Sequence, residues 1–86
     1  MKKILLVDDD ALVLELYRKK LAQGGFEVHT AGDGVAAIKK LSTLTPDFIV
    51  LDLMMPKLSG ADVLKFIRAK PALAKIPVAV LTNAFM

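Results

Sequence analysis

Acidic side chains follow two hydrophobic segments of this chain, at the points where those segments end. Residues 4–7 run directly into Asp8, Asp9 and Asp10, and residues 48–51 run into Asp52. If both segments are neighbouring strands of a parallel sheet, their carboxyl ends meet at the edge where open α/β sheets place their ligands. Crowded carboxylates disfavour one another, and oxygen ligands suit a hard divalent cation such as Mg²⁺. The pattern therefore predicts metal-assisted chemistry around Asp52.

Each candidate residue also has a purely structural interpretation. An aspartate before a helix is a favoured N-cap, which is the role that we expect for Asp10. Capping needs only one such residue, so Asp8 and Asp9 are expected to belong to a site. Asp52 follows a strand that should be fully buried, where an acid without a function would be costly. Thr82 is either a β-branched residue of the last strand or a hydroxyl that faces the same site.

Composition favours one small domain with an unusually apolar content. The 86 residues are 55% hydrophobic, with a mean hydropathy of +0.51. No apolar run approaches the roughly 18 residues of a membrane span, so the apolar excess is expected in a core or an interface. The first residues are too brief for a signal peptide, which predicts a cytoplasmic protein. The charge of +3 comes from scattered lysines, and scattered charge argues against direct nucleic-acid binding.

The apolar residues alternate between strand-like and helix-like spacing, which predicts a βαβαβαβ chain. Strands are expected at residues 2–7, 26–30, 47–53 and 77–82. The intervening helices should end at Gly24-Gly25, before Pro46 and at Pro71. Their inward faces should carry, in chain order, Val13, Leu16, Tyr17 and Leu21; Val35, Ile38 and Leu41; and Val63, Leu64 and Ile67.

Short connections between alternating strands and helices call for a parallel sheet with right-handed crossovers. The strands that contain Ile4 and Phe48 are apolar throughout and should be central, whereas the strand that begins at Phe26 should be an edge. The sequence therefore predicts a single α/β domain over residues 1–86, built on a doubly wound parallel sheet with strand order 2-1-3-4.

Taken together, these motifs closely resemble the receiver domain of bacterial two-component response regulators. The resemblance runs from Lys2 to Ala84 and includes the segments at residues 4–10, 33–34, 46–56, 60 and 76–82. It implies a flavodoxin-like fold. Receiver domains are a standard example of this fold, whose strand order is 2-1-3-4-5. Two rival classes fail at single positions. Acids at 8–10 would repel the phosphate of a flavin, and Met54 stands where a haloacid-dehalogenase-type phosphatase needs a second acid.

The resemblance implies a phosphorelay function in which Asp52 accepts a phosphoryl group from a histidine kinase or phosphotransfer protein. Such a domain assists its own phosphorylation and is not otherwise an enzyme. By the same resemblance, Mg²⁺ would be bound directly by Asp9 and Asp52, mainly through water by Asp8, and by the backbone carbonyl of Met54. Thr82 would be the switch residue, whose hydroxyl turns toward the phosphoryl oxygens.

Two features depart from the family pattern. Asn83 follows the expected switch residue, where the family usually has a small residue. The sequence stops at Met86, before the fourth helix, the fifth strand with its phosphoryl-binding lysine, and the fifth helix of the family. We therefore expect residues 1–86 to form a receiver domain that is incomplete at its C-terminus.

This departure leaves a second functional class open, a truncated or engineered receiver fragment that self-associates without signalling. In the order 2-1-3-4 the last strand would be an open edge, and one face of the strands at Ile4 and Phe48 would be uncovered. Identical chains commonly cover such surfaces by symmetric pairing. We therefore expect a homodimer or higher oligomer with its contact at or near Val78, Val80, Phe85 and Met86.

Overall fold

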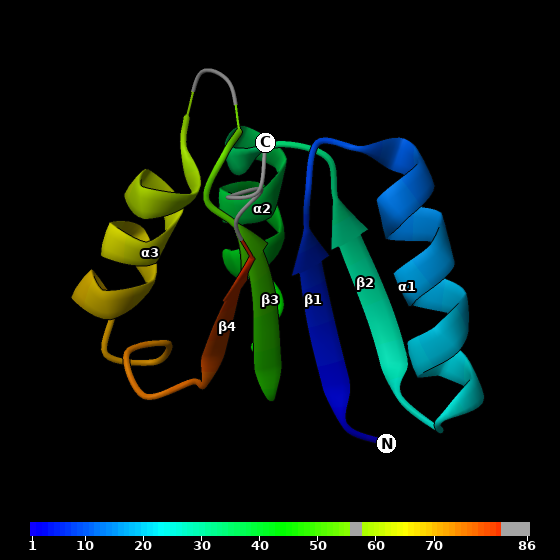
Figure 1. Cartoon of the computed structure of the whole chain (residues 1–86). Helices are drawn as coiled ribbons and strands as arrows, with labels where there is room; N and C mark the ends of the chain where they lie inside the picture. Colours follow the sequence, from blue (N-terminus) through cyan, green and yellow to red (C-terminus); the bar gives the residue numbers. More distant parts are fainter. Residues whose placement is uncertain (56–57, 82–86) are drawn as a thin grey trace.

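The computed structural model describes residues 1–55 and 58–81 of the chain. Strands and helices alternate along it as predicted (Figure 1). In chain order the elements are β1 (Lys3–Val7), α1 (Ala11–Gln23), β2 (Glu27–Ala31), α2 (Gly34–Leu41), β3 (Phe48–Asp52), α3 (Gly60–Ala69) and β4 (Val78–Leu81).

Each helix begins at a polar side chain that accepts hydrogen bonds from its first backbone N–H groups. Asp10 accepts from the amides of Leu12 and Val13 at 2.9 and 3.3 Å, which confirms it as the N-cap of α1. Asp33 caps α2 in the same way, and Ser59 forms a reciprocal capping box with Asp62 at the start of α3. Short polar residues therefore fix where all three helices begin.

The four strands form one parallel sheet in the order β2-β1-β3-β4, which confirms the predicted topology and the flavodoxin-like fold class. In the centre of the sheet, Leu6 lies opposite Val50 and Val7 opposite Leu51. Because β1 and β3 are hydrogen-bonded neighbours in this register, their carboxyl ends finish side by side (Figure 1).

One face of the sheet carries the closed hydrophobic core. Alternate strand residues, including Leu5 and Ile49, pack there against α2 and α3. The helices contribute Ala37 and Leu41 of α2 and Val63 and Ile67 of α3. We call this the closed face; α2 lies behind the sheet in Figure 1, with α3 beside it.

The opposite face is only partly covered, and we call it the open face. Its side chains come from the other set of alternate strand residues, and α1 packs along β1 and β2 on this side. Ile4 and Leu6 of β1 are buried, whereas the outward residues of β3 and β4 are only partly buried. The open-face set is Ile4, Leu6, Phe48, Val50, Ala79 and Leu81.

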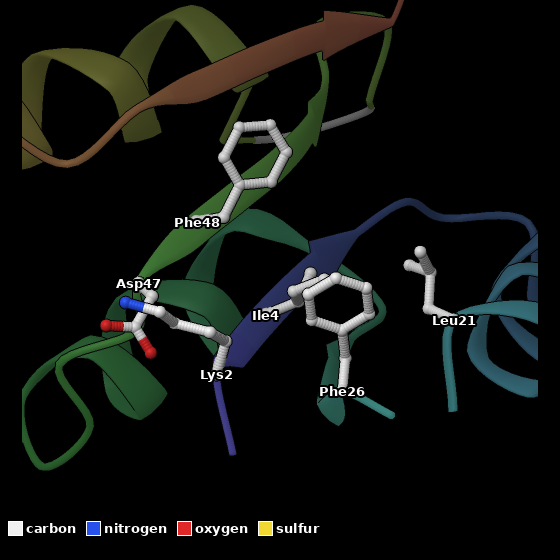
Figure 2. A pocket seen from close by; sticks show the side chains of 6 residues that line it. All are labelled: Lys2, Ile4, Leu21, Phe26, Asp47 and Phe48. Atoms are coloured by element: carbon white, nitrogen blue, oxygen red, sulfur yellow. The ribbon is translucent and has the colours of Figure 1, made fainter. Parts of the chain in front are cut away.

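Two apolar hollows of about 380 and 390 Å³ lie on the open face. The first is at the amino ends of the strands, where Phe48, Ile4 and Phe26 line it while Lys2 extends toward Asp47 (Figure 2). The second lies nearer the carboxyl ends, between the sheet and α1, with Val50, Tyr17 and Leu81 among its lining residues. The open face is therefore an indented apolar surface beside α1.

Two expectations about helix faces were wrong. Val35 was expected to face inward, but its side chain is 57% exposed because α2 turns Ala37 and Leu41 toward the core. Leu16 was expected on the inner side of α1 and is 59% exposed, and no residue of α1 is buried. The inward face expected for α3 is confirmed at Val63 and Ile67.

Candidate functional site

The predicted acidic residues lie at the carboxyl edge of the sheet, where β1 and β3 end. Asp8 directly follows β1, and its amide donates to the carbonyl of Ala31 at 3.1 Å, which ties it to the end of β2. Asp52 is the last residue of β3 and lies opposite Leu81 of β4. Neighbouring strands thus place these two side chains next to each other.

The structure brings together Asp8, Asp9 and Asp52. One carboxylate oxygen from each of the three lies within 4.8 Å of the others. Asp52 is only 3% exposed, whereas Asp9 is exposed to solvent. The cluster therefore has a buried base and an open outer side, so a small ligand can reach the carboxylates from solvent.

Backbone amides orient two of the three carboxylates. The amide of Met54 donates to Asp52 Oδ1 at 2.9 Å, and the amide of Asp10 donates to Asp8 Oδ1 at 2.9 Å. Each carboxylate is thus held by the amide two residues further along the chain, an Asx-type turn. Such local bonds fix where the acceptor oxygens lie without neutralising their charge.

The electrostatics of the cluster favour a cation. Burial raises the pKa of Asp8, and the carboxylates of Asp52, Asp9 and Asp10 raise it further. The hydrogen bond from the amide of Asp10 lowers it but does not cancel the rise. A raised pKa means that ionised Asp8 is less favourable in the folded chain than in water. A bound cation would offset this cost of ionisation.

The remaining predicted site residues lie in different places. Met54 is next to the cluster, with its side chain 56% exposed and its amide bonded to Asp52. Thr82 lies outside the described residues, as do Asn83, Phe85 and Met86. Asp10 caps α1 and is not a member of the carboxylate cluster, although it lies beside Asp8.

The sequence analysis did not identify two local contacts at this edge. It did not predict the amide of Met54 as a hydrogen-bond donor to Asp52. It also treated Gly60 only as part of a motif, whereas this residue lies directly against the backbone of Asp52 and Leu53. The signal for the second contact was present, because a glycine as the first residue of a helix is less usual than a polar cap followed by a good helix former.

Among the described residues, no helix combines the length and apolar character needed to cross a membrane.

A family model described as the response regulator receiver domain matches residues 4–85 of this chain. The chain is 44% identical over 81 residues to the alkaline phosphatase synthesis transcriptional regulatory protein PhoP of Bacillus subtilis, covering 94% of this chain and 33% of that protein. It is 41% identical over 80 residues to the response regulator MprA of Mycobacterium ulcerans, covering 93% of this chain and 34% of MprA. The chain thus spans about a third of the length of these curated relatives.

The fold is similar to that of the chemotaxis protein CheY4 of Vibrio cholerae, with a TM-score of 0.94 and 31% sequence identity. The similarity covers 100% of this chain and 72% of the CheY4 chain. The backbone arrangement that carries the three carboxylates is therefore similar to that of CheY4.

Proposed function

Because this chain belongs to the response regulator receiver family, we propose that Asp52 is the residue that accepts a phosphoryl group during phosphorelay signalling. Receiver domains of this family act in phosphorelay signalling. The observation that supports Asp52 in this role is the cluster of Asp8, Asp9 and Asp52 at the carboxyl edge of the sheet. Asp52 is the buried member, and the amide of Met54 orients its carboxylate.

The donor set of the cluster fits Mg²⁺. Its three oxygen ligands are carboxylates, and hard oxygen ligands in small number, completed by water, are what this ion takes in phosphoryl-transfer sites. We propose that Asp9 and Asp52 hold the ion directly, that Asp8 does so mainly through water, and that the backbone carbonyl of Met54 is a further ligand. When bound, Mg²⁺ would offset the negative charges of the carboxylates and the phosphoryl group.

The proposed reaction is an in-line substitution at phosphorus. A carboxylate oxygen of Asp52 forms a bond to phosphorus while the bond from phosphorus to the imidazole nitrogen of a phosphohistidine breaks. The electron pair of the broken bond stays on that nitrogen, which takes up a proton from solvent as the histidine leaves. The partner would be a histidine kinase or phosphotransfer protein. The chain would act as a phospho-acceptor that assists its own phosphorylation, with Thr82 as the switch residue.

The chain spans about a third of its curated relatives, whose printed names describe transcriptional or response regulation. We propose a cytoplasmic location, because the phosphohistidine donors of this family act there.

Binding of Mg²⁺ tests the site directly. Titration by isothermal calorimetry at neutral pH is expected to show one Mg²⁺ site. Asp52→Asn is expected to lower its affinity at least tenfold, because the substitution removes a buried carboxylate ligand of the ion. Asp47→Asn is the matched control, since Asp47 is exposed at the amino edge, where it accepts from the amide of Lys3. Equal weakening by both substitutions, or no binding by the unsubstituted chain, would contradict the assignment.

We also propose self-association of the chain through β4 and the adjoining open face. β4 is the outermost strand at one end of the sheet that the described residues form. Ala79 and Leu81 on its open-face side are only partly buried, and Val80, on its closed-face side opposite Leu51, is 42% exposed. Unpaired strand edges with apolar side chains favour pairing with another chain. Val78 packs against the closed-face core, so at this position only the strand's backbone edge is offered to a partner. Phe85 and Met86, expected near the same contact, lie outside the described residues.

Sedimentation of two lysine variants tests this second proposal. Val80→Lys places a charge on the β4 edge and is expected to shift the chain toward monomer at micromolar concentration. Val35→Lys is the control, because Val35 is also an exposed valine, at 57%, but lies on α2. A monomer mass for the unsubstituted chain at every concentration, or equal effects of both variants, would contradict self-association through β4.

A further inference from the structure

Two glycines lie against neighbouring backbone so closely that no side chain fits beside them. Gly60 is the first residue of α3, and a Cβ atom there would overlap the carbonyl oxygen of Asp52 and lie 2.6 Å from the Cα of Leu53. Gly34 is the first residue of α2, and a Cβ atom there would lie 2.5 Å from the carbonyl oxygen of Leu58 and 2.9 Å from its Cβ. All of these distances are shorter than real Cβ atoms show to their neighbours.

The other glycines of the described chain show that this crowding is specific. A Cβ atom at Gly32 would meet nothing within 4 Å, and one at Gly24 would make only ordinary contacts from 3.4 Å outward. Gly25 is needed for its backbone conformation, with a φ of 91°, in the turn that ends α1. Gly34 and Gly60 have no such φ, so what they supply is space for a close backbone approach.

Both close approaches involve residues at or just after the end of β3 or just before α3, namely Asp52, Leu53 and Leu58. Gly60 places the start of α3 directly on the last residue of β3, which is Asp52. Gly34 places the start of α2 on Leu58, which precedes the α3 cap. The amide of Met54, which donates to Asp52 Oδ1 at 2.9 Å, directly follows Leu53. Any side chain at position 60 must therefore displace the backbone that carries the carboxylate and its orienting donor.

We propose that Gly60 and Gly34 are positioning residues that fix the Asp52 carboxylate and the Met54 backbone through these two close approaches. The inference rests on the proposed function, because the geometry matters only if the cluster binds a ligand. The approach at Gly60 is to backbone atoms alone, which cannot be moved by a change of rotamer. At Gly34 the nearest atom is one backbone oxygen, that of Leu58, and the next two are Cβ and Cγ of the same residue, of which a change of rotamer moves only Cγ. Gly60 should accordingly be the less tolerant of the two.

Displacement of the backbone at Asp52 and Leu53 would disturb the ligand cluster. Side chains of a functional site need to be held to roughly 0.5 Å, and loss of the groups that orient ligands typically weakens metal binding about 10–100-fold. We expect Gly60→Ala to weaken Mg²⁺ binding by at least about tenfold and Gly34→Ala by several-fold. Gly32→Ala is the matched control and should leave the affinity within about twofold, since its Cβ meets open space.

The experiment compares Mg²⁺ affinity with fold stability for the three alanine variants. Calorimetric titration is done at a temperature where circular dichroism shows each variant fully folded, so a purely structural role would lower the melting temperature and leave the affinity of the folded chain unchanged. The backbone amide resonance of Met54 is followed by NMR in the same samples, because its shift reports the bond to Asp52. It is expected to move in Gly60→Ala and to stay in place in Gly32→Ala.

The outcomes separate the inference from the proposed function. If the unsubstituted chain binds Mg²⁺ but folded Gly60→Ala and Gly34→Ala bind as tightly as Gly32→Ala, the positioning role is overturned and the proposed function stands. If the unsubstituted chain does not bind Mg²⁺, the proposed function fails and the inference fails with it. Should Gly60→Ala not fold, Gly34→Ala decides, since a Cβ there meets a single residue, Leu58, and not the backbone of Asp52 itself.

Discussion

The two faces of the sheet are built from the same strands but differ in how they are covered. On the closed face Leu5, Ile49 and Leu51 are 0% exposed beneath α2 and α3. On the open face the buried apolar side chains of the described strands are Ile4 and Leu6 of β1, and α1, which covers them, has no buried residue of its own. The closed face is therefore fully covered by helices, whereas the open face is covered only in part, by α1.

The carboxylate cluster lies at the end of the open face. Because side chains alternate along a strand, Asp8 continues the row of Ile4 and Leu6, and Asp52 continues the row of Phe48 and Val50. The closed face therefore holds the strands in place, while the site continues the surface that is still open. The hollow nearer the carboxyl ends, which Leu6, Val50 and Leu81 line, is the part of the open face that adjoins Asp8 and Asp52.

Truncation of one leucine on each face should give the largest difference between them. Leu51→Ala removes a fully buried closed-face side chain and is expected to cost about 3–5 kcal/mol. Leu81→Ala removes a partly buried open-face side chain and is expected to cost about 1 kcal/mol. Urea unfolding followed by circular dichroism measures both. Equal losses would mean that the open face is as well packed as the closed one.

Removal of the α1 cap should give the next largest effect. Asp10→Ala loses the bonds to the amides of Leu12 and Val13, at a cost of about 1 kcal/mol. Since α1 has no buried residue, its amides should lose hydrogen-exchange protection before the rest of the fold. Asp10→Asn keeps the cap without the charge and is the control. Uniform loss of protection over α1 and α3 would show that α1 is not the weakly held helix.

Neutralisation of Asp8 should stabilise the metal-free chain. Burial and the neighbouring carboxylates raise the pKa of Asp8 in the folded state. The folded chain is therefore most stable, as far as Asp8 is concerned, at low pH, and this stability is lost as the pH rises through the folded-state pKa. At neutral pH, Asp8→Asn is therefore expected to gain about 0.5–1 kcal/mol.

Calorimetric melting with EDTA and then with excess Mg²⁺ measures this effect. The gain in Asp8→Asn should disappear in Mg²⁺, because the ion offsets the same repulsion in the unsubstituted chain. A lower melting temperature for Asp8→Asn in EDTA would contradict the electrostatic description of the cluster.

The smallest expected effect concerns Glu27 and His29 on β2. His29 Nε2 lies 2.7 Å from Glu27 Oε2, and this contact lowers the pKa of Glu27. A lowered pKa means that the pair contributes stability above the ordinary pKa of a glutamate, and this contribution is lost as the pH falls through the folded-state value. The difference in melting temperature between Glu27→Gln and the unsubstituted chain should therefore be greatest near neutral pH and vanish in acid. A difference that persists in acid would contradict this assignment.

The strand order and the acidic edge could both be predicted from the sequence, for a simple physical reason. Residues 4–7 and 48–51 are uninterrupted apolar runs, which only central strands of a parallel sheet need, and each ends in acid. Once those strands are neighbours, the approach of Asp8 to Asp52 follows from the register.

Other features depend on how the helices lie on the sheet, which spacing alone does not determine. Apolar residues occur almost all round the first half of α1, so the pattern could not show that Leu16 would be exposed. Val35 was misplaced because Gly34, the first helical residue, turns toward Leu58. The contact of Gly60 with Asp52 joins the start of α3 to the end of β3, and no local sequence pattern encodes how closely those two elements approach.

Phosphorylation of the chain by a small-molecule donor tests the central claim most directly. The protein is incubated with Mg²⁺ and acetyl phosphate, its intact mass is measured, and borohydride reduction followed by peptide mapping locates any acyl phosphate. The account predicts one phosphoryl group on Asp52, absent from Asp52→Asn, retained in Asp47→Asn and lost when EDTA replaces Mg²⁺. Equal phosphorylation of Asp52→Asn, or no phosphorylation of the unsubstituted chain, would contradict it.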